Sequence, residues 1–503
     1  MKKKLCLVLV AILIATTLVS CNNSINDTRN NATNGTQEVN KVAPIEKGNL
    51  YNISAELNAI DKTLSAKENL RYVNTENIEL KELYFHVYTN AFKEKETAPF
   101  LFDDFDRAYS RGFEPGYTEI SSVKVKDGED LKYSFQGVGN TILKVELKEP
   151  LKQGNIVELT MDFKITIPPA NERFGYGENH FNLGNWYPIS AVYDETGWNL
   201  DKYYAIGDPF YSDSSNYEVT IKAPKEYIIA SSGTLVTEKE EGNKKISQFQ
   251  SSNMRDFAFI ANKDLKISEK TVDGTIVKSY YYESDEKRGK DALETGVNSI
   301  KIFNEKFGKY PYPVYSVVET VFPSGMEYPG LVYISENYYK TFSNKDSLTI
   351  VIVHETAHQW WYSLVGNDQI DEAWLDEGFA TYSESIYIEN ALSAERGKNY
   401  FNNSVEERHN EVIADKVIDG VVVKGLEDFR NWDDYGPTVY TRGAVVLNEL
   451  RNKFGDEKFF KIMQEYFKEY KFKIATTVDF MNVSEKVTGQ QLDEFFNIWL
   501  YAK

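Results

Sequence analysis

Apolar and polar residues alternate through several segments of the N-terminal half of the chain. In the clearest case, residues 157–167, every second position from Val157 to Ile167 is apolar, and the positions between carry Glu, Thr, Asp or Lys. A period of two predicts a strand with one face on a core and one in water, as in antiparallel sheets. Residues 83–88 and 217–224 repeat the pattern. Residues 48–265 are therefore predicted to form an antiparallel β domain of saddle or sandwich type.

After about residue 266 the spacing of apolar residues becomes helical. Residues 347–366 are predicted to form one buried helix, with Ser347 as its N-cap and Gly366 at its end. A second helix is expected over about 371–392, and three more over 443–454, 456–470 and 492–501. Residues 266–503 are therefore predicted to form a second, mostly helical domain.

The first residues have the pattern of a secretory leader. A basic start is followed by an apolar run and by Leu18, Val19 and Ser20 before Cys21. This resembles a bacterial lipoprotein signal over residues 1–20, in which Cys21 becomes the lipidated N-terminus; an ordinary signal or an uncleaved anchor helix is the alternative. Residues 21–47 are polar and lack aromatics, which predicts a flexible stalk. The expected location is the outer face of a bacterial membrane.

The charge and the cysteine content narrow the function classes. A formal net charge of −19 argues against a nucleic-acid partner, because binding to phosphates needs a basic face. Of the two cysteines, Cys6 lies inside the leader, so the mature chain would have no intrachain disulfide.

The segment "HETAH" carries the candidate metal chemistry. On a helix, His354 and His358 lie on one face and can bind one cation, whereas Glu355 is turned away and suits a general base. A catalytic zinc ion usually has three protein ligands and one open position. Eighteen residues separate His358 from Glu377, which is the candidate third ligand at the start of the next helix. The neighbouring Asp376 is expected to support a ligand or to be a surface charge.

These segments resemble the M1 family of zinc aminopeptidases, a gluzincin family. "HETAHQWW" and "WLDEGFA" resemble the family's zinc motifs, with Asp376 where Asn is usual. "SGMEY", residues 324–328, resembles its G-x-M-E-N exopeptidase motif. The resemblance implies one Zn²⁺ per chain and a thermolysin-like catalytic domain. It also implies that Glu327, with Met326 and Gly325, binds the free amino group of a peptide substrate.

The resemblance extends to two further positions. "TVYTRGA" places Tyr440 where the family has a tyrosine that stabilises the oxyanion. An additional amine-binding residue is expected in the β domain, with Glu178 as the choice and Asn185 as its rival. Many relatives continue with a large helical domain beyond the position of Lys503, so the site is expected to be more open or to be closed by a partner. The oligomeric state stays open.

The expected function is therefore removal of N-terminal residues from peptides, with Glu355 as base and Tyr440 as oxyanion donor. Three alternatives stay open. A thermolysin-like endopeptidase shares the zinc ligands but needs no amine anchor, and an epoxide hydrolase shares most of the motifs. A catalytically inert surface-binding protein on a peptidase fold would not need Glu355 or Tyr440.

Overall fold

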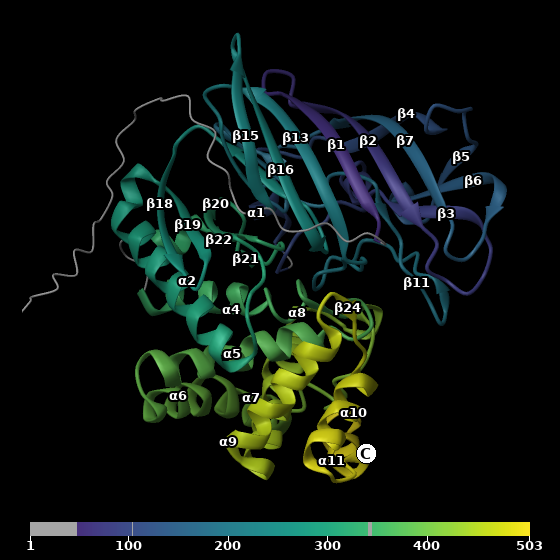
Figure 1. Ribbon diagram of the computed structural model, residues 1–503. Helices are drawn as coiled ribbons and strands as arrows, with labels where there is room; N and C mark the ends of the chain where they lie inside the picture. The colour runs from purple at the N-terminus through teal and green to yellow at the C-terminus, as the bar shows by residue number, and fades with distance from the viewer. Residues whose placement is uncertain (1–47, 103, 341–344, 503) are drawn as a thin grey trace, which may run out of the picture. The chain divides into compact units, whose positions relative to one another are not determined.

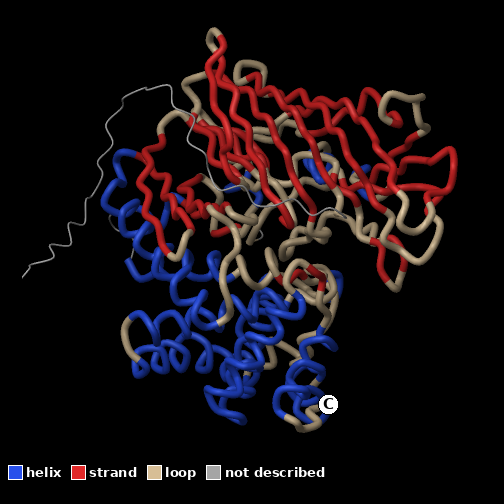
Figure 2. The backbone as a smooth tube through the Cα atoms, in the orientation of Figure 1, coloured by secondary structure: helices blue, strands red, loops and turns tan. Residues whose placement is uncertain are grey.

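The computed structural model describes residues 48–102, 104–340 and 345–502. Strands are concentrated in the first part of this range and helices in the second (Figure 2). The predicted fold class, a β domain followed by a mostly helical one, is confirmed. The leader and the stalk lie outside the described residues, and the domain boundary at residue 265 stays a prediction. Among the residues described, no helix is long and apolar enough to cross a bilayer.

A seven-stranded sheet dominates the N-terminal part (Figure 1). The segment with the clearest alternation lies within β7, where Leu159, Met161 and Ile165 are fully buried. All neighbouring strands in this sheet are antiparallel except β1 and β13, which are parallel. The order across the sheet is β15 (Thr234–Glu241), β16 (Lys244–Met254), β13 (Ser215–Pro224), β1 (Leu50–Asn58), β2 (Thr63–Val73), β7 (Ile156–Thr166) and β4 (Tyr117–Val125).

Smaller sheets complete the β part. Two of them have four strands and one is a short hairpin. The first is β10 (Ile189–Ser190), β3 (Leu80–His86), β6 (Ile142–Leu151) and β5 (Tyr133–Gln136). The second is β14 (Ile228–Ser231), β17 (Phe259–Asn262), β9 (His180–Leu183) and β8 (Phe174–Tyr176). The hairpin is β11 (Tyr193–Asp194) with β12 (Gly197–Trp198).

A five-stranded mixed sheet leads into the helical part. Its order is β18 (Leu265–Val272), β19 (Thr275–Tyr282), β20 (Val314–Thr320), β22 (Leu331–Ser335) and β21 (Gly325–Met326). The short edge strand β21 pairs with β22 and also contacts helix α4 (Lys345–Ala357). This edge places the predicted exopeptidase motif against the helix that carries the two histidines.

The helices follow the predicted order, but the first of them differs at both ends. The helix predicted over 347–366 is α4, which begins at Lys345 and ends at Ala357, so Ser347 lies inside the helix and the predicted N-cap is wrong. Beyond it the chain turns sharply, Tyr362 has a φ of 123°, and Gly366 lies in a two-residue strand rather than at a helix end. That strand, β23 (Val365–Gly366), pairs with β24 (Lys473–Ile474). The predicted end at Gly366 is therefore wrong, because apolar spacing marked buried residues and not their backbone conformation.

The other predicted helices are present. The predicted helix over 371–392 is α5, and those over 443–454 and 456–470 are the two halves of α9, separated at Gly455 with a φ of 78°. Besides α4, the α-helices of the described residues are α1 (Phe105–Ala108), α2 (Glu286–Lys306), α3 (Glu336–Tyr339), α5 (Trp374–Ala391), α6 (Ala394–Phe401), α7 (Glu407–Ala414), α8 (Trp432–Gly436), α9 (Gly443–Tyr470), α10 (Thr477–Thr488) and α11 (Asp493–Tyr501).

A buried arginine joins the end of the large sheet to the helical part. Arg255 is 1% exposed and follows β16 directly. Its guanidinium donates to the carbonyls of Ser212 (2.6 Å), Tyr362 (2.9 Å) and Lys473 (2.9 Å). A guanidinium that satisfies three carbonyls from distant segments fixes those segments together, and its loss would leave buried acceptors unpaired.

One acidic side chain lies inside the large sheet without a partner. Glu68 occupies an inward position of β2, where Leu64, Ala66 and Leu70 are its apolar neighbours on the same face. It is fully buried, and neither carboxyl oxygen has a hydrogen-bond partner among the described residues. Burial therefore raises the pKa of Glu68 well above its usual value.

This position makes stability depend on pH. Between the usual glutamate pKa and the raised one, the native state binds more protons than the unfolded state, so stability falls as pH rises. We expect Glu68→Met to raise the melting temperature at pH 8 by several degrees and to change it less at pH 5. Thermal unfolding followed by circular dichroism measures this difference. Glu119→Met, at an exposed position of β4, is the control and should show no such pH-dependent gain.

Candidate active site

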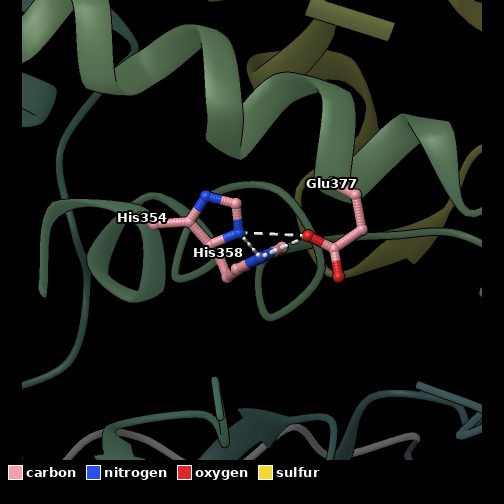
Figure 3. A group of neighbouring side chains, drawn as sticks. All are labelled: His354, His358 and Glu377. Carbon is pink, nitrogen blue, oxygen red and sulfur yellow. Dashed lines mark hydrogen bonds and ion pairs between the residues drawn. The ribbon is translucent and has the colours of Figure 1, made fainter. Parts of the chain in front are cut away.

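Three side chains bring their donor atoms together at one point. His354 Nε2 lies 3.1 Å and His358 Nε2 3.2 Å from the same oxygen of Glu377, and the two nitrogens are 3.1 Å apart (Figure 3). The sequence predicted these three residues as metal ligands, and the structure brings them together. Around a tetrahedral zinc ion with bonds of about 2.0–2.1 Å, ligand atoms would be about 3.3 Å apart. The donor set and its spacing therefore fit one zinc ion.

Two packed helices create this arrangement. His354 lies in the last turn of α4, His358 follows that turn, and Glu377 lies in the first turn of α5, which contacts α4. The second nitrogens of the imidazoles are also engaged. His354 Nδ1 lies 2.8 Å from Glu384, and His358 Nδ1 lies 3.1 Å from the carbonyl of Trp361. These contacts direct both Nε2 atoms toward Glu377, as is usual for imidazoles that bind a metal.

The charges at this point stabilise one another. Burial disfavours the charged form of His358, but Glu377 and Glu327 outweigh it and raise the pKa of His358 to about 10. Burial likewise opposes the charged form of Glu377, but the two histidines hold the pKa of Glu377 well below its usual value. A cation bound to the same three atoms would replace the imidazole protons and keep the carboxylate charged, so metal binding would release protons.

Glu355 lies between the two histidines in the sequence and beside β21 in space. It is 5% exposed, and burial raises its pKa to about 7. The backbone of Gly325 lies so close that a Cβ atom there would be 1.9 Å from a Glu355 oxygen. A larger residue at position 325 would therefore displace the Glu355 carboxyl from its present position. A carboxyl with a pKa near 7 can both accept and release a proton at neutral pH.

Tyr440 contacts the same cluster from the segment before α9. Its hydroxyl donates to the second oxygen of Glu377 at 2.7 Å, and its ring stacks on His354 with the centroids 5.8 Å apart. It lies in a π-helical turn, Pro437–Arg442. Burial and the nearby Glu377 raise its pKa well above the usual value. Tyr440 is therefore a neutral donor at the metal cluster.

Glu327 lies next to the cluster, as the motif resemblance implied. Its carboxyl is 3% exposed, and donor atoms of Glu327, His358 and Asp376 lie within 4.8 Å of one another. Its neighbours fix the loop: Met326 Sδ lies 3.0 Å from Arg173 Nε, and the Tyr328 hydroxyl donates to Asn185 at 2.9 Å. Both of these partners come from the β part of the chain.

The structure does not bring Glu178 to this site. Glu178 is exposed in the turn between β8 and β9, and no contact shown among the described residues joins it to Glu327 or to the three ligands. Asn185, its rival, contacts the loop through Tyr328 but not Glu327 itself. The choice of Glu178 rested on its sequence distance from Trp186, and a role of Glu178 in amine binding has no support from its exposed position.

Two site residues were missed from the sequence. Asp208, paired with Arg173, is 7% exposed, and its charge contributes to the raised pKa of Glu327. Nothing in the local sequence marks Asp208, which reaches the site through a loop of the β part. Glu384 had a usable signal, because it follows Glu377 by seven residues and therefore lies on the same face of α5, two turns on.

Asp376 was predicted either to support a ligand or to be a surface charge, and the second alternative is wrong. It is fully buried, and burial with the nearby Glu377 raises its pKa to about 7. Its carboxyl accepts hydrogen bonds from the side chain of Gln369 and from the backbone N–H of Glu377. Asp376 thus supports the start of α5, where Glu377 lies.

Known proteins resemble this chain in sequence. Residues 291–499 match the model of the peptidase family M1 domain. "Aminopeptidase M1-D" of Oryza sativa subsp. japonica is 26% identical over 303 residues, which cover 57% of this chain and 34% of the relative. "Aminopeptidase 2" of Candida albicans is 25% identical over 411 residues, covering 76% of this chain and 42% of the relative. The match thus spans about a third to two fifths of the length of these relatives.

Solved structures share the fold. An M1 zinc metallopeptidase from Deinococcus radiodurans superposes with a TM-score of 0.61 at 18% identity, covering 90% of this chain and 94% of the other. A mutant of that protein bound to a Tyr-Ser-Ala substrate gives the same TM-score at 17% identity. This likeness extends over both the β part and the helical part.

The metal cluster, the adjacent Glu355 and the Glu327 loop all lie in or next to the matched segment. These features agree with the match of residues 291–499 to the peptidase family M1 domain and with the shared fold.

Proposed function

We propose that this protein is a zinc-dependent aminopeptidase that removes N-terminal residues from peptides. The observation that carries the proposal is the buried carboxyl group of Glu327 beside the three metal ligands. A carboxylate in this position can pair with the α-ammonium group of a peptide. This pairing would fix the distance between the N-terminus and the peptide bond that is cleaved at the metal. A substrate that is cut within its chain presents no free amine at this position. The Glu327 carboxylate therefore argues against a thermolysin-like endopeptidase.

The three ligands would hold the metal ion. Two imidazole nitrogens and one carboxylate oxygen are a common protein ligand set for catalytic zinc, and the family match supports the same metal. Bound there, zinc supplies a Lewis acid that polarises the peptide carbonyl and acidifies a water molecule. Glu384 and the Trp361 carbonyl keep the two imidazoles oriented for this task.

Glu355 is the proposed general base. With a pKa of about 7 it can take a proton from the attacking water and pass it to the leaving amine. Tyr440 is the proposed oxyanion donor. Its hydroxyl donates to Glu377 at 2.7 Å in this structure, and turning toward the substrate would let it donate to the carbonyl oxygen as negative charge develops.

For location, we propose attachment to the outer face of a bacterial membrane through a lipid on Cys21. The support is the basic, apolar and small-residue pattern before that cysteine. A lipid tether followed by a polar segment would hold the folded part near the membrane while leaving it accessible to peptides.

The first test concerns the amine anchor. Purified protein should release the first residue from unblocked tripeptides and leave the N-acetylated forms intact, because only a charged amine can pair with Glu327. Mass spectrometry of the products, with and without a zinc chelator, makes the comparison. Equal cleavage of both forms would point to an endopeptidase. A zinc-loaded protein without any turnover would favour a binding protein.

The second test concerns the base. Glu355→Gln keeps the shape of the side chain and removes its basicity, so kcat should fall at least about 100-fold while one zinc per chain is retained. Kinetics together with elemental analysis by mass spectrometry measure both effects. Glu407→Gln, at an exposed position of α7, serves as the matched control. Retained activity in Glu355→Gln would refute the assigned base.

The third test concerns the anchor to the membrane. In a bacterial host, Cys21→Ser should move the protein from the membrane fraction to the soluble fraction and abolish its labelling by an alkyne fatty acid. Cys6→Ser changes the other cysteine, inside the leader, and should change neither the membrane location nor the fatty-acid labelling. A Cys21→Ser protein that stays in the membrane would indicate an uncleaved anchor helix instead.

A further inference from the structure

Gln369 links the amine anchor to a second buried carboxyl group. It lies between β23 and α5 and is 1% exposed. Its amide nitrogen lies 3.3 Å from Glu327 Oε1 and also within hydrogen-bond distance of Asp376 Oδ2. An amide has two N–H groups, so one side chain can donate to both carboxyl groups at once.

The contacts of Gln369 reduce the repulsion between the two buried carboxyl groups. Atoms of Glu327 and Asp376 lie within 4.8 Å of each other, both groups are buried, and Asp208 adds negative charge nearby. Like charges at this distance in a buried place repel strongly. The two N–H groups of Gln369 lie where they offset this repulsion, and they hold the Glu327 carboxyl in one orientation.

A second metal ion is a weaker explanation for the same group. Glu327, His358 and Asp376 could in principle hold a cation. However, both nitrogens of His358 are already engaged, Nε2 at Glu377 and His354, and Nδ1 at the Trp361 carbonyl. The imidazole therefore has no nitrogen left for a second ion, and the amide of Gln369 already serves the two carboxyl groups.

The backbone of Glu327 is held separately. Gln359, the residue after His358, accepts from the N–H of Gly330 at 2.8 Å and donates to the carbonyls of Tyr328 and Glu327 at 3.3 and 3.4 Å. The loop position is thus fixed by Gln359, which leaves the orientation of the Glu327 carboxyl group to Gln369.

We propose that Gln369 is a positioning residue for substrate binding, which orients the Glu327 carboxyl toward the free amine of a peptide and separates it from Asp376. This inference rests on the proposed aminopeptidase function. It predicts that removing the amide weakens the binding of the substrate amine while the three metal ligands, none of which is among these two partners of the Gln369 amide, still bind zinc.

The decisive variant is Gln369→Met, which is similar in length and has no N–H donor. With the aminoacyl coumarinylamide that the wild type cleaves fastest, KM should rise about 10-fold, as expected for the loss of a hydrogen bond to a charged group, and kcat should fall much less. Zinc content should remain one per chain. Gln490→Met, at an exposed position after α10, is the matched control and should behave as the wild type.

Rescue distinguishes positioning from a general structural role. Asp376→Asn removes one carboxylate and supplies an amide near Glu327, so in the double variant Gln369→Met with Asp376→Asn the raised KM should fall most of the way back to the wild-type value. Such a coupled effect is what a double-mutant cycle detects between neighbours. An unchanged KM in Gln369→Met, or a raised KM that Asp376→Asn does not relieve, would overturn the proposal.

Two other results, an unfolded Gln369→Met variant and an inactive wild type, can also be interpreted. If Gln369→Met does not fold, Gln369→Asn keeps an amide on a shorter side chain that cannot reach both partners, and an unchanged KM there also overturns the inference. If the wild type itself cleaves no unblocked substrate, the proposed function fails, whatever the variants show.

Discussion

The candidate active site depends on the burial of charged groups that stabilise one another. Glu377 is nearly inaccessible to water, and an isolated carboxylate there would be costly. It remains charged because two imidazoles contact one of its oxygens and Tyr440 donates to the other. These contacts require α4 and α5 to pack in one register. The same packing creates the metal-binding geometry, so structure and chemistry share a single constraint.

Contacts between the β part and the helical part extend this constraint. Arg255 joins three carbonyls from distant segments, Arg173 contacts Met326, and Asn185 accepts from Tyr328. The Glu327 loop is therefore held both by the helix that carries the histidines and by strands from the first half of the chain. The amine anchor that we propose at Glu327 needs such support from both sides.

Some features followed from local pattern and others did not. The spacing of His354 and His358 predicts a shared ligand face because a helix repeats every 3.6 residues. The strand β7 followed equally from its alternation. The end of α4 did not, because residues 358–366 are buried although they are not helical, and the turn at Tyr362 forms where its carbonyl accepts from Arg255. The position of Asp208 depends on a long loop and could not be predicted from neighbouring residues.

The sequence by itself determined the ligand types, their helical spacing and the succession of a strand-rich part and a helical part, because these depend on residues close together in the chain. Only the tertiary structure decided that Glu178 is exposed in a turn, that Asp208 and Asp376 are buried beside the site, and that Gln369 lies between two carboxyl groups. Electrostatic interactions of this kind act through space over a few ångströms. Residues from distant parts of the chain therefore meet, or do not meet, only when the whole chain has folded.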